Sequence, residues 1–201
     1  SGFIGLNICL QLKKSEHTVY GISRNRCDIL ARNKIRQLNL DLMSDNLDEI
    51  TSLGVDAVVH CAATAELNAG KTQHVASFTV LKNLLASLEK TSPLIIYLSS
   101  IAAVDRASGD DATLPLNEKT DSNPQSHYGE YKLKCEDLIK NSAYDFIILR
   151  PSLVVGDGMR MESHFRNFAR IGLKGSLISR LPWSGKFSVV HVEDLADAVI
   201  C

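Results

Sequence analysis

The chain alternates short, almost continuously apolar segments with segments of helical periodicity, and this alternation limits its fold more than any other feature. Strands are predicted at Thr18–Ile22, Asp56–Cys61, Leu94–Ser99 and Phe146–Leu149, with a weaker one at Ser188–His191. Helices are predicted at Gly5–Lys13, Leu47–Leu53, His74–Lys90 and Tyr128–Lys140. Strands of this kind are typical of a parallel sheet that helices cover on both faces. We therefore predict an α/β fold with a doubly wound parallel sheet in three α/β/α layers.

The composition is that of a globular protein and argues against several classes of function. The 201 residues are 45% hydrophobic and carry a formal net charge of −1, which argues against a general binder of nucleic acids or anionic membranes. No apolar run approaches the ~18 residues that a transmembrane helix needs. The five cysteines have no C-x-x-C spacing, so we expect no metal site, no disulfide framework, and a reducing, cytoplasmic compartment.

Both ends of the sequence fall inside predicted elements. The first residues form a glycine turn that leads directly into an apolar-periodic helix, and the last residues, "VEDLADAVIC", have the pattern of a helix. Domains rarely end inside amphipathic elements. We therefore expect the chain to be an excerpt of a longer protein, with a small complete domain as the alternative.

The segment "SHYGEYK", residues 126–132, places Tyr128 and Lys132 four residues apart. On a helix this spacing brings a phenol and an ammonium group onto one face, one turn apart. Only Tyr128 among the five tyrosines has a lysine at this spacing, but a solvated helix surface would explain a single pair equally well. The pair follows a polar segment, residues 105–125, that we expect to be a long surface loop of the kind that often carries function.

Other residues suited to ligand binding lie next to the predicted elements. Ser99 and Ser100 follow a buried strand, and ligands of parallel α/β sheets bind beyond the carboxyl ends of the strands. Gly2 and Gly5 come directly before a helix, where glycines let backbone N–H groups approach a pyrophosphate at the positive end of the helix. The sequence therefore predicts a nucleotide site at this edge of the sheet.

Seven short motifs, in order along the whole chain, resemble those of the extended short-chain dehydrogenases/reductases, also called the NAD-dependent epimerase/dehydratase family. They are "SGFIG", "LDLMSD", "VVHCAA", "YLSSIAAV", "YGEYK", "LRPSLVVGDG" and "FSVVHVEDLADAV". The resemblance implies a Rossmann-like fold. Residues 1–150 would form an NAD(P)-binding domain that lacks its first strand. Residues 151–201 would begin a small C-terminal substrate domain that is interleaved with the sheet.

The resemblance also implies roles for single residues. Ser100, Tyr128 and Lys132 would be catalytic, with Ser99 as the alternative to Ser100. The residues that it places at the cofactor, together with Tyr128 and Lys132, are Gly2, Phe3, Ile4, Gly5, Asp41, Leu42, Cys61, Ala62, Ala63, Ser77, Leu98, Pro151 and Ser152. Substrate contacts are expected from Ser100, Arg160 and Lys186.

The function that these roles imply is hydride transfer at a secondary alcohol or ketone, in an NAD(P)-dependent epimerase or reductase acting on a nucleotide sugar. Tyr128 would be the acid/base. A free phenol has a pKa near ~10, and we expect Lys132 and the nicotinamide to lower the pKa of Tyr128. Lys132 would also hold the nicotinamide ribose, Ser100 would hydrogen-bond the reacting oxygen, and Tyr131 would serve packing. The alternative is a non-catalytic NADP-binding module for regulation or assembly.

The choice of cofactor depends on residues 23–25, Ser23, Arg24 and Asn25, at the end of a predicted strand. An acidic residue at this place selects NAD through the ribose 2′-hydroxyl, whereas a serine and an arginine suit the 2′-phosphate of NADP. No acidic residue occurs before Asp28. We therefore expect NADP, with NAD as the alternative. This preference favours a reductase over an epimerase.

A few positions depart from the family pattern. Ser77 stands where the family often has asparagine, and Ile101 and Ala102 stand where dehydratases often have an Asp-Glu pair, which argues against dehydration. His60 is expected to be a packing residue at a strand end. We expect the whole protein to be a homodimer that binds a small-molecule substrate and no nucleic acid.

Overall fold

The structure, a computed structural model, describes residues 2–44, 46–62, 71–105, 116–159 and 188–201. Its strands are β1 (Tyr20–Ser23), β2 (Arg36–Asn39), β3 (Ala57–His60), β4 (Leu94–Leu98), β5 (Phe146–Leu149), β6 (Leu153–Val155) and β7 (Val189–His191). Its helices are α1 (Phe3–Lys14), α2 (Asp28–Arg32), α3 (Asp48–Ser52), α4 (Lys71–Ser87), α5 (His127–Lys140) and α7 (Val192–Ile200), with a short 3-10 helix, η1 (Ile101–Val104). None of these described helices is long and apolar enough to cross a bilayer.

Every strand pair in the described residues is parallel, as predicted. β4 is the middle strand of a three-stranded ladder, with β3 on one side and β5 on the other. β1 pairs with β2, and β6 pairs with β7. No backbone ladder joins β1 to β3 among the described residues. Parallel strands alternating with helices confirm the α/β class.

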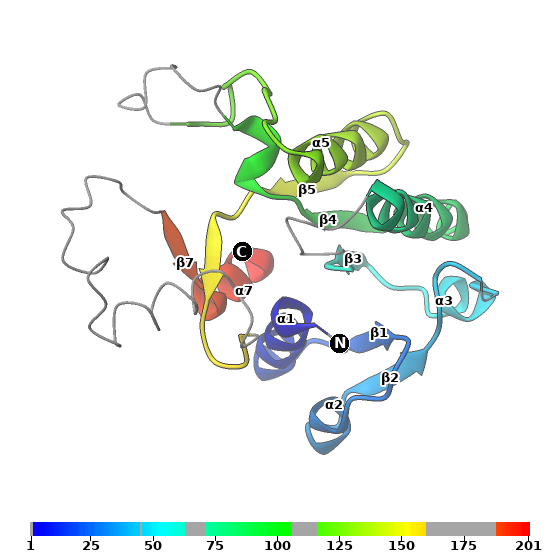
Figure 1. Cartoon of the computed structure of the whole chain (residues 1–201). Helices are drawn as coiled ribbons and strands as arrows, with labels where there is room; N and C mark the ends of the chain where they lie inside the picture. The colour runs from blue at the N-terminus through cyan, green and yellow to red at the C-terminus, as the bar shows by residue number, and fades with distance from the viewer. Residues whose placement is uncertain (1, 45, 63–70, 106–115, 160–187) are drawn as a thin grey trace.

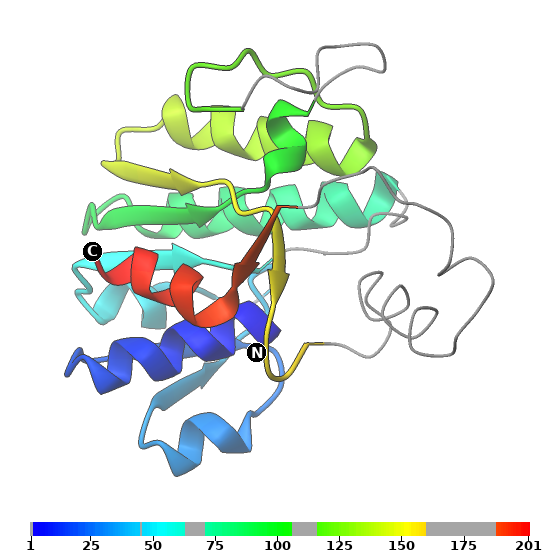
Figure 2. The same ribbon diagram turned by 90° about the vertical axis from the view of Figure 1, so that its left-hand side faces the viewer.

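Helices cover both faces of the β3–β4–β5 ladder. α4 and α5 pack together on one face, and α1 and α7 pack together on the other (Figure 1, Figure 2). The side chains of β4 show this arrangement. Ile95 and Tyr97 belong to the apolar cluster with α4 and α5, whereas Ile96 and Leu98 belong to the cluster with α1 and α7. Because both faces of β4 are buried, its sequence has no polar alternation. The predicted three layers are therefore confirmed.

The sequence did not predict β2, β6 or α2. β2 has the sequence "RQLN", and only Leu38 of its residues is buried, with 4% of its surface exposed. A strand with one buried side chain gives no continuous apolar run, so its pattern was not recognised. Smaller differences concern element ends: β1 begins at Tyr20 rather than Thr18, and α4 covers residues 71–87 rather than 74–90.

The start of α5 is fixed by a side-chain cap and by close packing against η1. The Oγ atom of Ser126 accepts a hydrogen bond of 3.1 Å from the backbone N–H of Gly129, one of the donors that a helix start leaves free. A Cβ atom at Gly129 would overlap the carbonyl oxygen of Ala102, so a glycine is needed for α5 to lie this close to η1. Since η1 follows Ser100 directly, this contact brings the first turn of α5 to the end of β4.

Candidate active site

The residues expected at the site gather beyond the carboxyl ends of β3, β4 and β5, beside the start of α1. Gly2 is the N-cap of α1, so Gly5 lies within the first turn rather than before the helix. A Cβ atom at Gly5 would lie 3.5 Å from the Cβ atom of Cys61, directly after β3. The backbone N–H of Ile101 donates to the carbonyl oxygen of Pro151 at 3.0 Å, which joins the segments after β4 and β5.

Lys132 is buried within this group, with 3% of its surface exposed. Its Nζ atom donates a hydrogen bond of 2.6 Å to the carbonyl oxygen of Leu98. The ammonium group lies 4.9 Å from the ring centroid of Tyr97 and 5.8 Å from those of Tyr128 and Tyr131, within cation–π range. Burial lowers the pKa of Lys132 to about 8. Among the described residues, no carboxylate forms an ion pair with this ammonium.

Tyr128 lies one turn before Lys132 on α5, which confirms the predicted shared face, and it is half-buried. Burial raises the pKa of Tyr128 above the ordinary value of a tyrosine, and a hydrogen bond with Ser100 opposes this rise. The sequence predicted a lowered pKa for Tyr128. This prediction is wrong for the protein without a bound cofactor. The physical reason is that desolvation outweighs the lysine, whose short hydrogen bond goes to the Leu98 carbonyl.

The two serines after β4 have different partners. Ser100 is the N-cap of η1, where its Oγ atom accepts from the backbone N–H of Ala102 at 3.3 Å, and it also hydrogen-bonds with Tyr128. Ser99 is buried and donates a hydrogen bond of 2.5 Å to Oε1 of Glu136. The geometry therefore favours Ser100 over Ser99 as the serine that can reach an oxygen bound beside Tyr128.

Aromatic rings surround the Tyr128 side of the site. Tyr131 is 5% exposed and belongs to the apolar core, as predicted. His60 stacks on Tyr97 with 5.9 Å between ring centroids, and burial lowers its pKa to about 4, so it is a neutral packing residue, as predicted. His74, which no sequence pattern singled out, stacks on Tyr131 at 5.2 Å and lies 6.1 Å from the Tyr128 ring. Within the described residues, neither ring nitrogen of His74 has a hydrogen-bond partner.

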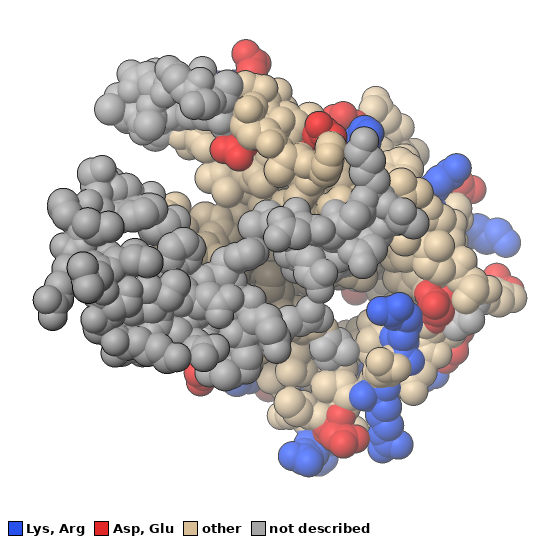
Figure 3. Space-filling model, in the orientation of Figure 1, with Lys and Arg blue, Asp and Glu red and all other residues tan. Residues whose placement is uncertain are grey.

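The loop after β1 is held by Gln37 of β2, a residue that the sequence analysis missed because β2 itself was missed. Gln37 Nε2 donates to Ser23 Oγ at 2.9 Å and to the Asn25 carbonyl at 2.7 Å, and Gln37 Oε1 accepts from the backbone N–H of Cys27 at 2.8 Å. Ser23 Oγ donates its single proton to the Asn25 carbonyl at 2.8 Å. Arg24 is exposed. Figure 3 shows Lys and Arg side chains over β1, β2 and α2, with Asp and Glu side chains among them.

Residues 41–42, expected near the adenine, are fastened to α4. Asn83 Nδ2 donates a hydrogen bond of 3.0 Å to the carbonyl oxygen of Leu42, and Asp41 Oδ1 accepts from the backbone N–H of Met43 at 3.0 Å. Ser77 lies on the same helix as Asn83 and is buried, with 8% of its surface exposed. The segment that follows β2 is therefore fixed to α4, the helix that carries Ser77 and His74.

The start of α1 and the buried Lys132 fit a negatively charged dinucleotide. The first turn of α1, with Phe3 and Ile4, contains no acidic residue, and within the described residues its N-cap makes no side-chain hydrogen bond. Free N–H groups at a helix start bind phosphate oxygens. A Cβ atom at Gly2 would meet no atom of the described residues within 4 Å, so none of them fills the space beside the N-cap. The donors at this place therefore fit the pyrophosphate and ribose of a nicotinamide dinucleotide.

Not all expected site residues can be placed. Ala63, Arg160 and Lys186 lie outside the described residues. Ala62, directly after Cys61, is exposed, and Ser152, directly after Pro151, is half-buried. The described part of the site thus contains the start of α1, the loop after β1, and the residues of β4 and α5 around Lys132.

The whole chain, residues 1–201, matches the model of the NAD dependent epimerase/dehydratase family. It is 26% identical over 221 residues to the UDP-glucose 4-epimerase of Vibrio cholerae, and the match covers 100% of this chain and 63% of that protein. The chain therefore spans less than two thirds of the length of that relative.

Among solved structures, the UDP-N-acetylglucosamine 4-epimerase from Bacillus cereus is 24% identical with a TM-score of 0.80, over 100% of this chain and 68% of that chain. The UDP-glucuronic acid 4-epimerase from Bacillus cereus, solved with UDP-glucuronic acid and NAD, is 22% identical with a TM-score of 0.77, over 99% of this chain and 69% of that chain. At these identities the two structures establish the shared fold. Because the family model matches the full chain, the chain belongs to the NAD-dependent epimerase/dehydratase family.

Proposed function

We propose that this chain is the core of an NAD-dependent epimerase that inverts one hydroxyl-bearing carbon of a nucleotide sugar. The observation that carries the proposal is the group formed by Ser100, Tyr128 and Lys132, which join a hydrogen-bonded phenol to a buried ammonium. Fold alone would not separate an enzyme from a binding module. A regulatory NADP-binding module has no use for a buried phenol paired in this way, so the group favours the enzyme.

In the proposed reaction, a carbinol carbon loses a hydride and its oxygen loses a proton, and both are returned after the ketone has turned. Tyr128 accepts the hydroxyl proton and gives it back, while Ser100 hydrogen-bonds the same oxygen. The positive charge of Lys132 favours the phenolate of Tyr128. The same ammonium group is also a hydrogen-bond donor for the cofactor ribose. Bound NAD supplies the reversible hydride acceptor. Because burial raises the pKa of Tyr128, the phenolate that accepts the first proton depends on the positive charge of Lys132 beside it.

We assign NAD rather than NADP as the cofactor, although the sequence favours NADP. Ser23 donates its only hydroxyl proton to the Asn25 carbonyl, so it has none left for a 2′-phosphate. Gln37 holds both ends of this loop and keeps that arrangement. The family is named for its dependence on NAD. With NAD as the cofactor, the preference for a net reductase loses its basis, and epimerisation becomes the first choice.

The substrate is proposed to be a UDP-sugar, because the curated relative is a UDP-glucose 4-epimerase. Arg160 and Lys186 remain the proposed contacts of the diphosphate, and residues 151–201 the proposed start of the substrate domain. A homodimer remains the proposed state of the whole protein.

The test incubates the whole protein with NAD and, separately, with UDP-glucose, UDP-galactose and UDP-N-acetylglucosamine, and follows the sugar C4 epimers by proton NMR. We expect one of these sugars to reach an epimer equilibrium. Tyr128→Phe should slow this conversion by about 10²–10⁴-fold and leave NAD affinity nearly unchanged. NAD binding without conversion of any of these sugars would favour the binding module. Equal turnover in Tyr128→Phe would remove Tyr128 from its role.

A further inference from the structure

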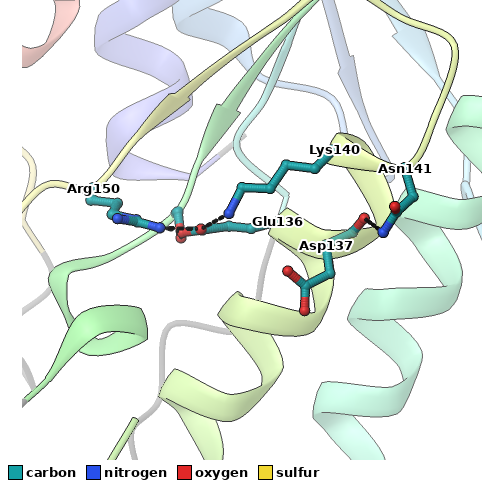
Figure 4. A network of polar contacts seen from close by, with 6 residues as sticks. Glu136, Asp137, Lys140, Asn141 and Arg150 are labelled. Atoms are coloured by element: carbon teal, nitrogen blue, oxygen red, sulfur yellow. Dashed lines mark hydrogen bonds and ion pairs between the residues drawn. The ribbon is translucent and has the colours of Figure 1, made fainter. Parts of the chain in front are cut away.

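Glu136 is the most completely buried charged residue in the described part of α5, with none of its surface exposed. Arg150 donates two hydrogen bonds to it, from Nε to Oε1 at 2.9 Å and from Nη2 to Oε2 at 2.6 Å. Ser99 Oγ donates to Oε1 at 2.5 Å, and Lys140 Nζ donates to Oε2 at 3.2 Å. Figure 4 shows Arg150 and Lys140 reaching the carboxylate from opposite sides. Each carboxylate oxygen therefore has two donors.

The partners of Glu136 are the sequence neighbours of the proposed catalytic and cofactor-binding residues. Ser99 directly precedes Ser100, and Arg150 directly precedes Pro151 at the end of β5. Glu136 itself lies one helical turn after Lys132 on α5. One carboxylate thus connects the three chain segments that carry the site, although its bonds to Ser99 and Arg150 span 37 and 14 residues of sequence.

Stability alone is a weak reason for this arrangement. A carboxylate without solvent contact loses its hydration, and apolar side chains of similar volume often join buried segments equally well. What apolar contacts do not provide is direction. A two-point Arg–carboxylate pair and a short O–H···O bond fix the angles and the separations of the groups that they join.

Resting on the function proposed above, we propose that Glu136 is a positioning residue, which holds Ser100 at the separation from Tyr128 and Lys132 that proton transfer requires. Glu136 acts through Ser99 and through its own helix, and it does not touch the reacting atoms. Displacements near 1 Å at a reacting group can cost about 100-fold in rate. The hydrogen bonds of Glu136 are therefore expected to influence the chemical step more than the binding of the nucleotide sugar.

The first test compares Glu136→Gln with Asp137→Asn in the whole protein. Glu136→Gln keeps the size of the side chain but removes the charge. Asp137 is the next residue, is exposed, and turns its carboxylate away from the network (Figure 4), so it is a matched control for one lost negative charge on α5. We expect kcat to fall about 10- to 100-fold in Glu136→Gln with KM changed less than about threefold, and neither to change in Asp137→Asn.

A second variant covers the case in which Glu136→Gln folds poorly. Ser99→Ala removes only the bond toward Ser100 and leaves the Arg150–Glu136 pair in place, so the fold should persist. We expect kcat to fall about three- to tenfold with NAD affinity unchanged. A lower melting temperature with the kcat of wild type, in either Glu136→Gln or Ser99→Ala, would show that the network serves stability alone and would overturn the proposal.

A readout without turnover separates this proposal from the proposed function. The ε-carbon resonance of Lys132, in protein with ¹³C-labelled lysine, reports the protonation and surroundings of the ammonium. Glu136 faces it from α5 together with Cys135, and Cys61 and His60 face it from the β3 side. Ser99→Ala, which removes no charge, should shift this resonance, because Lys132 Nζ donates to the carbonyl of Leu98, the residue before Ser99, and Asp137→Asn should not shift it. An unshifted resonance in Ser99→Ala would overturn the proposal even if no sugar is converted, whereas a shifted resonance without any turnover would count only against the proposed function.

Discussion

Lys132 and Glu136 lie one turn apart on α5, are both buried, and are paired to opposite degrees. Glu136 receives two hydrogen bonds from Arg150 and one from Ser99, in addition to a lysine at the helix end. Within the described residues, Lys132 donates to one backbone carbonyl, that of Leu98, and otherwise faces aromatic rings. In this part of the chain, the same helix therefore carries one buried charge whose oxygens all have donors and one whose ammonium has a single acceptor.

The pKa values of Glu136 and Lys132 are both lowered, but the lowering has opposite consequences for the two charges. Burial pushes the pKa of Glu136 up, and the hydrogen bonds and charge of Arg150, with help from Ser99, outweigh it and hold the pKa below its usual value. For Lys132, burial dominates and lowers the pKa to about 8. The surroundings thus favour the charged form of Glu136 and disfavour the charged form of Lys132. A buried group whose charged form is disfavoured in the free protein is typical of a site that binds a ligand.

The largest effect is expected from Lys132→Met. Loss of the ammonium should lower turnover by about 10²–10⁴-fold, because the phenolate of Tyr128 loses its positive neighbour. The free energy of unfolding at pH 7 should rise, because an apolar side chain replaces a desolvated charge. Lys134→Met is the control, since Lys134 is exposed on the same helix and should change neither quantity. A lower free energy of unfolding in Lys132→Met than in wild type would show that the folded protein stabilises the ammonium of Lys132 as fully as the carboxylate of Glu136.

The next largest effect is expected when the buried carboxylate of Glu136 is removed and its partner Arg150 is left behind. Glu136→Leu leaves Arg150 without its carboxylate, and the free energy of unfolding should fall by about 3–5 kcal/mol in urea denaturation. The double variant Glu136→Leu/Arg150→Met removes both charges and should recover most of this loss. If the double variant is as unstable as the single one, the ion pair is not the reason for the loss.

The sequence predicted Lys132 and missed Glu136 for a physical reason. The spacing of Tyr128 and Lys132 is a local property of one helix, so the shared face follows from helix geometry alone. The partners of Glu136 lie on other elements, and only the folded packing brings Ser99 and Arg150 to it. A polar residue at i+4 from Lys132, on the buried stripe of α5, was the available signal.

The layers of the fold and the serine–tyrosine–lysine group were predictable because buried strands and helix periodicity are sequence patterns. The polar strand β2 and its residue Gln37 were not, because a single buried side chain gives no pattern. For the protein without cofactor, the pKa of Tyr128 lies above its ordinary value and not below it as predicted, since desolvation depends on neighbours that the sequence does not locate.

The desolvation of Lys132 also predicts how stability depends on pH. The pKa of Lys132 is about 8 in the folded protein and near 10.5 when unfolded. Between these values the unfolded chain binds a proton that the folded protein has released, so this residue's contribution to stability rises with pH. The free energy of unfolding of Lys132→Met relative to wild type should therefore fall by an amount on the order of 3 kcal/mol between pH 8 and pH 10.5. Urea denaturation at several pH values checks this, and a constant difference would contradict it.

The smallest effect is expected where a charge is exposed. Arg24 lies in solvent beside β1, so a contact from Arg24 to a cofactor phosphate would be screened and worth less than about 1 kcal/mol. We expect the whole protein to prefer NAD, and Arg24→Ala to change the ratio of NAD to NADP affinity, measured by calorimetry, by less than about fivefold. Arg26→Ala is the control, because Arg26 is also exposed in the same loop and its ion pair with Asp28 is long, at 3.7 Å.

The opposite outcome would show that Arg24, like Lys132, is a charge that serves the site and is not a surface charge screened by solvent. If wild type prefers NADP and Arg24→Ala removes a preference of about ten- to a hundredfold, the arginine makes a charge-assisted contact that excludes water. Such a contact would require the loop after β1 to rearrange, because Ser23 and Asn25 are bonded to each other and to Gln37. Gln37→Leu would then increase NADP affinity, because it removes the hydrogen bonds that Gln37 donates to Ser23 Oγ and to the Asn25 carbonyl and so loosens this loop. In that case NADP and a net reduction would regain first place over epimerisation.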